Sequence, residues 1–446
     1  MSGAKRTLHP ADRYVPWSQA IKWPLVPLSK VASLNPVTLS ETTDPLTQLR
    51  YIDIGSVDSK GKVTEPTKLI FEEAPSRARR VLAPGDTIFS TVRTYLKAVA
   101  YIDHAEPGMV CSTGFAVLRP NHLVYPKFLF YWIRSDNFVD EVCARSIGVS
   151  YPAVRPSEIG HLPALNLSIV VQRTISDFLD RKTAAIDALI AKKERIVELL
   201  AEECQSLITR AVTKGLNANV PLKYSGLPWL GDIPAHWSVK RMSYIAVALQ
   251  TGPFGSQLHT SDYLEGGTPL VNPSHIVDGR IEPDLKCAVG EEKLATLRRH
   301  KLRAGDIVFA RRGELGRCAV VTEREEGWLC GTGSIRIVLD KSHAAPFFVA
   351  QAASLSGSRD WLQIESVGAT MDNLNASIVG GLPLPFPPLS EQLETVKYIQ
   401  SLARVTDTIR SQMERSLSAL REYRQALITS AVTGQIEVPV SSRKAA

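Results

Sequence analysis

The chain has 446 residues, of which 44% are hydrophobic and 22% are charged. This composition is typical of a globular protein, and the length is sufficient for more than one hydrophobic core. No stretch approaches the roughly 18 consecutive apolar residues that a membrane span requires, and the first residues lack the apolar segment of a signal peptide. We therefore expect neither membrane insertion nor export.

The cysteines and the net charge further narrow the possible classes of protein. The six cysteines form no CxxC pair, so the sequence predicts neither a zinc site nor a disulfide framework, and the expected compartment is a reducing cytoplasm. Fifty-two Lys and Arg residues against forty-five Asp and Glu residues leave a net charge of +7. This excess suits a polyanionic partner, or it reflects a merely basic surface.

The chain contains an internal repeat. Leu207-Ile208-Thr209 recurs 220 positions later as Leu427-Ile428-Thr429. The same offset relates further pairs: Leu162-Pro163 with Leu382-Pro383, Gln172 with Gln392, Ser146-Ile147-Gly148 with Ser366-Val367-Gly368, and Pro84-Gly85-Asp86 with Ala304-Gly305-Asp306. The repeat predicts two halves of the same architecture, related by a pseudo-twofold axis.

The starts of the two halves also correspond, with a slipped register. Trp17 and Trp23 match Trp229 and Trp237, which must lie where the first long helix ends. The repeat therefore predicts that Trp17 and Trp23 lie near residues 427–437.

The residue composition of each half changes along its length. Short β-rich runs broken by Gly, Pro and Asn predict mixed α+β globular domains, and each domain is followed by a long segment without Gly or Pro. The predicted segments are an N-terminal segment (1–22), a first globular domain (23–162), a central helix region (163–215), a second globular domain (216–381), a C-terminal helix region (382–437) and a tail (438–446).

The two Gly- and Pro-free segments, 168–213 and 389–433, predict one long helix each, ending at Gly215 and Gly434. Their apolar positions alternate in steps of four and three, which indicates a coiled coil. The first helix runs from the first globular domain to the second, and the second helix starts on the second domain. Helices that pack along their full length must therefore be antiparallel. The predicted contact positions are 175, 179, 182, 186, 189, 193, 196, 200, 203 and 207 in the first helix, and 399, 402, 406, 409, 413, 416, 420, 423 and 427 in the second.

Motifs for catalysis are missing from the sequence. It has no phosphate-binding GxxxxGK[ST] loop, and Gly331-Thr332-Gly333 lacks the context of a cofactor loop. Pro283-Asp284 with Glu291-Glu292-Lys293 superficially resembles a metal-dependent nuclease site, but a solvated charge cluster is favoured. The histidines have no metal-ligand spacing. We expect no catalytic residue and no metal ligand.

Basic residues recur around the Gly-Asp turn of each half. Cations in both halves suit phosphate contacts and guanine recognition, and a solvated charged face is the alternative. The candidate DNA-binding residues in these clusters are Arg79, Arg80, Arg93 and Lys97 in the first half, and Arg299, Lys301, Arg311, Arg312 and Arg317 in the second.

A polar segment closes each globular domain and supplies further candidates. Segments 148–151 and 368–373 begin with glycine and present hydroxyl and amide groups, among them Ser150, Tyr151, Thr370 and Asn373. These groups suit contacts to bases or phosphates. A capping box before the last domain helix explains them equally well.

Two further motifs carry a family resemblance. Residues 382–392 (Leu-Pro-Leu-Pro-Phe-Pro-Pro-Leu-Ser-Glu-Gln) open the second helix, and residues 251–256 (Thr-Gly-Pro-Phe-Gly-Ser) lie in the second globular domain. With the repeat and the long helices, they resemble the specificity (S) subunit of a type I restriction-modification system. The first half lacks both the proline pair and a Gly-Pro-Phe-Gly element. The resemblance adds Ser256 and Gln257 to the DNA-binding candidates.

The resemblance implies an α+β fold with two target-recognition domains separated by two long antiparallel helices. It implies a non-catalytic reader in which each domain recognises one half of a bipartite target in double-stranded DNA. The helices would set the spacer and dock two methyltransferase (M) subunits, which restriction (R) subunits join. The chain itself would hold no cofactor, because S-adenosylmethionine, ATP and Mg²⁺ would belong to the partner subunits.

Two other classes stay open at this level. A self-contained DNA methyltransferase or nuclease would need a cofactor loop and an Asn/Asp-Pro-Pro-aromatic motif. Phe386-Pro387-Pro388 does not complete such a motif. A coiled-coil scaffold without DNA function would explain the helices but not two similar basic domains.

Overall fold

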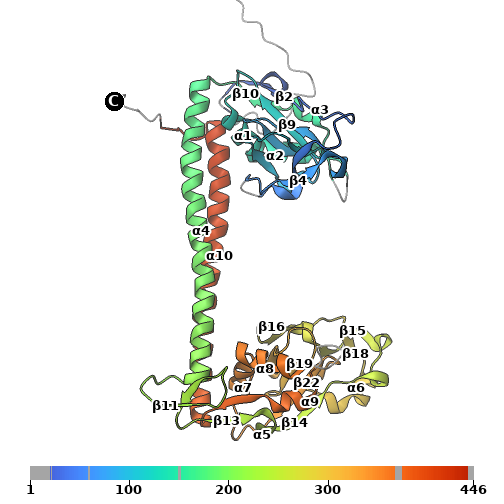
Figure 1. The fold of residues 1–446 in the computed structure, drawn as a ribbon, viewed down its shortest axis with the longest axis vertical. Coiled ribbons are helices and arrows are strands. Elements are labelled where there is room, and N and C mark those ends of the chain that lie inside the picture. Colours follow the sequence, from blue (N-terminus) through green and yellow to red (C-terminus); the bar gives the residue numbers. More distant parts are fainter. Residues whose placement is uncertain (1–20, 22, 59–60, 149–151, 367–373, 440–446) are drawn as a thin grey trace, which may run out of the picture. The chain divides into compact units, whose positions relative to one another are not determined.

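The computed structural model describes residues 21, 23–58, 61–148, 152–366 and 374–439. The chain forms two compact units, and both long helices contribute to each of them (Figure 1). Unit 1 comprises residues 1–195 and 413–446, and unit 2 comprises residues 196–412. The boundary between units therefore falls within the helices. The six predicted segments stay a prediction.

Unit 1 contains two four-stranded sheets, and an apolar cluster that includes Ile52, Ile88 and Val117 draws on both of them. The first has the strand order β2-β9-β6-β7 and the second the order β4-β3-β8-β5. The pair β3 and β8 is parallel, and the other neighbours are antiparallel. The strands are β2 (Ala32–Leu34), β3 (Gln48–Ile52), β4 (Thr67–Ile70), β5 (Ala78–Val81), β6 (Thr87–Ser90), β7 (Val99–Tyr101), β8 (Met109–Ser112) and β9 (Phe115–Pro120).

Helices of unit 1 cover the first sheet. Helix α1 (Pro126–Arg134) has proline in its first turn, and α2 (Asp136–Arg145) is capped by Ser135. The Phe89 ring of β6 packs edge-on against Phe138 of α2, with 5.9 Å between centroids. A two-stranded ribbon of β1 (Leu25–Pro27) and β10 (Pro163–Leu165), preceded by α3 (Pro156–Gly160), leads into the first long helix.

Unit 2 repeats this plan. Its main sheet has the order β14-β22-β19-β20, and a smaller sheet has the order β18-β15-β21 with β15 and β21 parallel. The elements are β13 (Ser238–Arg241), β14 (Ala246–Thr251), β15 (Tyr263–Val271), β18 (Ala288–Val289), β19 (Ile307–Ala310), β20 (Cys318–Val320), β21 (Leu329–Cys330), β22 (Ser334–Leu339), β23 (Pro383–Phe386), α6 (Glu291–Thr296), α7 (Pro346–Ala353), α8 (Ser356–Ser366) and α9 (Ala376–Gly381).

The two long helices are confirmed. Helix α4 (Ile169–Lys214) has 46 residues and α10 (Leu389–Thr433) has 45. Each is followed by a glycine with a positive φ, the left-handed backbone conformation that commonly ends an α-helix. In unit 1 they run antiparallel, as predicted: Asp187 pairs with Arg424 at 2.9 Å, and Glu194 pairs with Arg421 at 2.9 Å. None of the described helices is both long and apolar enough to cross a membrane.

The contact positions on α4 differ in part from the prediction. Thr183 and Ile190 are 5% and 1% exposed, whereas the predicted Lys182 is exposed and Leu189 is 44% exposed. Val197 and Cys204 are likewise less exposed than the predicted Ile196 and Glu203. Steps of three and four can alternate in either order, so the spacing did not decide between neighbouring residues. On α10, Tyr423 is 57% exposed while Arg424 makes the contact, and Leu417, which is 7% exposed, is more buried than the predicted Ser416.

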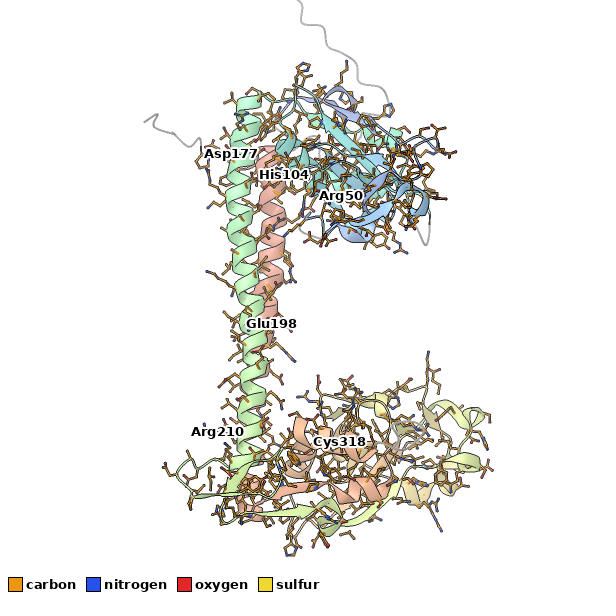
Figure 2. The ribbon with its side chains drawn as sticks, in the orientation of Figure 1. Arg50, His104, Asp177, Glu198, Arg210 and Cys318 are labelled. Carbon is orange, nitrogen blue, oxygen red and sulfur yellow. The ribbon has the colours of Figure 1, made fainter. Side chains whose placement is uncertain are left out.

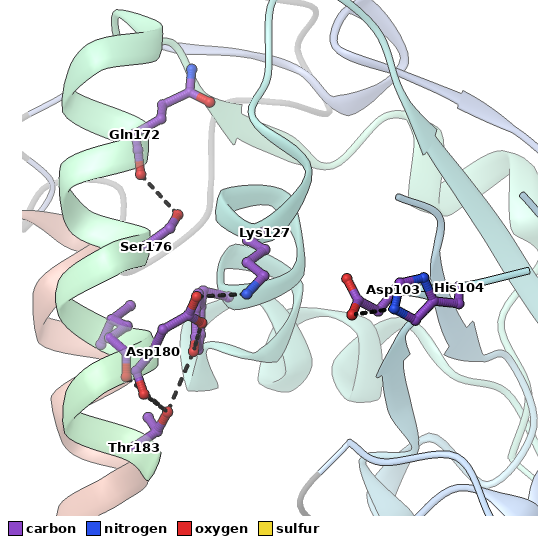
Figure 3. A network of polar contacts seen from close by, with 9 residues as sticks. Asp103, His104, Lys127, Gln172, Ser176, Asp180 and Thr183 are labelled. Carbon is purple, nitrogen blue, oxygen red and sulfur yellow. Dashed lines mark hydrogen bonds and ion pairs between the residues drawn. The ribbon is translucent and has the colours of Figure 1, made fainter. Parts of the chain in front are cut away.

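A polar network joins α1 to α4 in unit 1 (Figure 3). Lys127 Nζ donates to Asp180 Oδ2 at 2.7 Å, and the Tyr131 hydroxyl donates to Asp180 Oδ1 at 2.7 Å. Burial raises the pKa of Tyr131, so its hydroxyl stays a donor. The Tyr131 hydroxyl also lies 3.4 Å from the Thr183 hydroxyl. This packing explains why residue 183, rather than residue 182, faces inward.

The tryptophan prediction is confirmed for Trp23. A Cβ at Gly434 would lie 2.5 Å from Trp23 Nε1, so the indole packs directly on the glycine that ends α10. In unit 2, a Cβ at Gly215 would lie 3.1 Å from Trp237 Cζ2. Each long helix thus ends beneath a tryptophan of its own unit. Trp17 lies outside the described residues.

Candidate nucleic-acid interface

The loops of unit 2 gather at one end of its main sheet. Strand β14 ends at Thr251, β19 ends at Ala310, and their neighbours β20 and β22 begin there. The neighbouring strands β15 and β21 end at Val271 and Cys330, and the loops that follow them pack against each other, Gly331 against Asn272 and Gly333 against Pro273. We call loops 252–257, 272–275, 311–317 and 331–333 the second loop edge.

Unit 1 has an equivalent edge. Strand β6 ends at Ser90, where β9 and β7 begin, and Thr91 N donates to Gly114 O at 2.8 Å. A Cβ at Gly114 would lie 2.8 Å from Ile54 Cδ1, which brings the turn after β3 to the same end. We call loops 53–56, 91–98 and 113–114, with Arg77, the first loop edge.

The Gly-Asp turns have a structural role at the opposite end of these sheets. Asp86 is fully buried and accepts two hydrogen bonds from Arg119, each 2.8 Å long. Asp306 accepts from Arg336 Nε at 2.6 Å. In unit 1 the Gly-Asp turn joins β5 and β6, which belong to different sheets.

The first-half candidates make several internal contacts. The Arg79 guanidinium lies 4.4 Å from the centre of the Phe71 ring, and Arg80 Nη1 donates to the Thr38 hydroxyl at 3.4 Å. Arg93 N donates to Pro152 O at 2.8 Å. Lys97 pairs with Asp136 at 3.1 Å across the start of α2. Arg93 and Lys97 both lie on the first loop edge.

The second-half candidates are brought together more closely. Arg311 Nε donates to Leu374 O at 2.8 Å, and Arg311 N donates to Gly333 O at 2.9 Å. Burial and the neighbouring Arg312 lower the pKa of Arg311. Arg317 pairs with Glu314. The second loop edge thus holds Ser256, Gln257, Arg311, Arg312 and Arg317, whereas Arg299 and Lys301 are exposed residues that precede β19.

The closing polar segments are described only at their borders. Ser150, Tyr151, Thr370 and Asn373 lie outside the described residues. The N-cap of α9 is Asn375, whose side chain accepts from Ile378 N at 2.8 Å, and the N-cap of α3 is Arg155, without a side-chain bond. Capping of α9 therefore falls on a residue beyond the predicted segment.

The two weak catalytic candidates have structural explanations. A Cβ at Gly331 would lie 2.1 Å from Asn272 Oδ1, so close packing accounts for this glycine. In the charge cluster, Lys293 pairs with Asp262 at 2.8 Å, and Glu291 and Glu292 are exposed in the first turn of α6. Within the described ranges, His, Cys, Asp and Glu form no group of three that could hold a metal ion.

Sequence reasoning missed a second repeated motif at the loop edges. Cys111-Ser112-Thr113-Gly114 and Cys330-Gly331-Thr332-Gly333 are related by 219 positions, one less than the main register. Both cysteines are fully buried, and both threonines lie on the loop edges. A comparison that allowed a one-residue gap would have found this motif.

The similarity to known proteins extends over nearly the whole chain. Residues 245–418 match the model of the type I restriction modification DNA specificity domain. The EcoKI specificity subunit of Escherichia coli K12 is 23% identical over 93% of this chain and 89% of its own length. The StySPI specificity subunit of Salmonella potsdam is 22% identical over the same shares.

Solved structures agree. A chain from a structure of the type I restriction-modification system, described for its assembly and conformational transition, has a TM-score of 0.67 and 25% identity over 93% of this chain and 98% of its own. Over nearly its whole length, the chain is similar to specificity subunits of type I restriction-modification systems. The specificity subunit of Thermoanaerobacter tengcongensis has a TM-score of 0.51 and 25% identity, covering 93% of this chain and 97% of its own.

The matched domain, residues 245–418, includes the second loop edge and the first part of α10. The full-length relatives extend the likeness to unit 1.

Proposed function

We propose that each unit reads one half of a bipartite target in double-stranded DNA through its loop edge. The observation that carries this proposal is the repetition of the loop edge: both units place a buried cysteine, a Thr-Gly turn and cationic side chains at the same end of equivalent sheets. Arg and Lys neutralise phosphates, and Arg also recognises guanine.

The helices set the spacer between the half-targets and dock two M subunits. At 1.5 Å per residue, helices of 45 and 46 residues are roughly 68 Å long, which is longer than a typical domain is wide. R subunits join the complex for cleavage. The specificity subunit carries out no chemistry itself and works in the cytoplasm, while S-adenosylmethionine, ATP and Mg²⁺ are held by its partners.

The test is methyl transfer to DNA by the purified chain, alone and with its M subunits, followed by mapping of the methylated sequence. We expect no transfer by the chain alone and transfer at one bipartite sequence by the complex. Transfer by the chain alone would support a self-contained methyltransferase instead. Complexes that methylate without sequence preference would contradict a reading role.

A further inference from the structure

Arg77 is anchored at the first loop edge by its backbone. Thr113 N donates to Arg77 O at 2.8 Å, so the residue is tied to the Thr-Gly turn of the repeated motif. In unit 2 the corresponding turn binds a different arginine, because Arg311 N donates to Gly333 O at 2.9 Å. Each unit therefore attaches one arginine backbone to its Thr-Gly turn, from different positions in the sequence.

The Arg77 guanidinium is also held in place. Nε donates to the Tyr51 hydroxyl at 3.2 Å, and Nη2 donates to Asp53 Oδ2 at 3.3 Å. Asp53 is fixed in turn, since its Oδ1 accepts from Ile54 N at 2.7 Å. Tyr51 is only 5% exposed, so the support is rigid.

The geometry leaves one edge of the guanidinium available. Nε and Nη2 form the lateral edge of the plane, and both donate within the protein. The terminal edge, formed by Nη1 and the second hydrogen of Nη2, has no acceptor for Nη1 among the described residues, and the side chain is 57% exposed. Two parallel N–H groups on a fixed plane match the O6 and N7 acceptors of guanine in the major groove.

The charge of Asp53 favours a base over a phosphate. Its carboxylate lies 3.3 Å from Nη2, so the pair presents little net positive charge to an approaching anion. A phosphate would meet the carboxylate at close range, whereas the neutral edge of a base would not.

We propose that Arg77 reads a guanine in the first half-target, with Tyr51 and Asp53 as positioning residues. The inference rests on the proposed function and extends it to one residue that was not among the candidate DNA-binding residues selected from sequence. Arg50, on the same strand as Tyr51, is the matched control: it pairs with Glu106 at 2.6 Å, and Figure 2 labels it in unit 1.

The experiment uses the complex of the full chain with its M subunits. Methylated sequences are mapped for wild type, Arg77→Ala, Arg77→Lys and Arg50→Ala. Both Arg77 variants should lose roughly 5- to 150-fold discrimination at a single base pair of the first half-target. The second half-target and the spacer should be unchanged, which shows that the variant complex is assembled. Arg50→Ala should leave both half-targets unchanged.

Two further measurements separate base reading from other roles. Tyr51→Phe and Asp53→Asn should relax the same base pair as Arg77→Ala, because they release the guanidinium. The salt dependence of DNA binding by Arg77→Ala should keep the wild-type slope, since a lost phosphate contact would lower it by about 0.9.

The outcomes distinguish this inference from the proposed function. A wild-type complex without a bipartite target would overturn the proposed function. A bipartite target that stays intact in Arg77→Lys, or a lowered salt slope with uniform weakening in Arg77→Ala, would overturn the role of Arg77 alone. If Arg77→Ala gives no active complex, an unchanged first half-target in Arg77→Lys and Tyr51→Phe would still overturn it.

Discussion

Gln172 and Gln392, 220 positions apart, make the same three hydrogen bonds. Gln172 Oε1 accepts from Tyr125 N at 2.7 Å, and Gln392 Oε1 accepts from Ala345 N at 2.8 Å. The Nε2 of each donates to two carbonyl oxygens, those of Leu123 and Leu167 for the first and those of His343 and Pro387 for the second. Both side chains are fully buried. Each joins the start of a long helix to the globular part of its own unit.

Gln392→Ala should destabilise unit 2 by about 3 kcal/mol, because it leaves one N–H and two carbonyl groups buried without their partner. Chemical unfolding followed by circular dichroism measures the loss. Lys397→Ala, at an exposed position of α10, is the control and should change stability by less than about 0.5 kcal/mol. Equal unfolding midpoints for the two variants would contradict the role of Gln392.

Trp237 and Trp23, which pack on the ends of α4 and α10, differ in the hydrogen-bond acceptor of the indole N–H. Glu391 accepts from Trp237 Nε1 at 2.9 Å and lies 2.7 Å from His236 Nε2. The equivalent position in unit 1 is Val171, and Trp23 Nε1 is buried without an acceptor among the described residues. Val171→Glu should therefore stabilise unit 1 by about 1 kcal/mol, through this hydrogen bond and the favourable N-terminus of α4. Val170→Glu, beside it at a 76% exposed position, should gain less. A midpoint no higher for Val171→Glu than for Val170→Glu would count against the pairing.

Three buried thiols should resist alkylation in the folded protein. Burial raises the pKa of Cys111 and of Cys330 to about 12, and that of Cys318 to about 11. At pH 8 we expect iodoacetamide to label Cys143 and Cys204 first, as their side chains are partly exposed. Mass spectrometry of the labelled peptides gives the order, and early labelling of Cys111 would contradict the packing.

The same thiols predict a loss of stability in alkali. Below the unfolded thiol pKa of about 8.5, both states hold the proton and no change is expected. Above it, the unfolded thiols ionise while the folded thiols stay protonated, so the unfolded state binds fewer protons and unfolding becomes easier. Unfolding midpoints should therefore fall from about pH 9 upward. A Cys111→Ala variant should show a smaller fall than wild type.

Replacing Arg311 and Arg312 with Ala should weaken DNA binding. If both contact phosphates, the slope of binding against salt should fall by about one for each lost contact. Filter binding or fluorescence anisotropy at several salt concentrations measures the slope. An unchanged slope at full affinity would assign these arginines to a solvated face.

Lengthening the helices should change the spacer without changing the half-targets. Duplicating residues 191–194 after Ile190 adds about 6 Å to α4, which is close to two base pairs at about 3.4 Å each. Because Glu194 pairs with Arg421, a matching insertion after Leu420 in α10 is needed to keep the helices in register. The methylated sequence of the variant complex gives the result. Altered bases within a half-target at unchanged spacing would mean that the helices do not set the gap.

The sequence alone determined the repeat, the two long helices and their ends, because these depend on local chemistry. Apolar residues in steps of three and four, with Gly215 and Gly434 as stops, specify a helix whatever it packs against. The 220-residue offset likewise identified Gln172 with Gln392, although not the hydrogen bonds that they make.

The tertiary structure decided which residues face inward and which meet at the loop edges. Thr183 rather than Lys182 is buried because Tyr131 and Asp180 pack beside it. Asp86 proved to be the partner of Arg119, 33 positions away, at a turn that joins two sheets. Arg77, Tyr51 and Asp53 meet because β3 and β8 pair in parallel and the Thr113 turn returns to Arg77. Contacts of this kind depend on strand pairing between distant segments, which spacing along the chain does not encode.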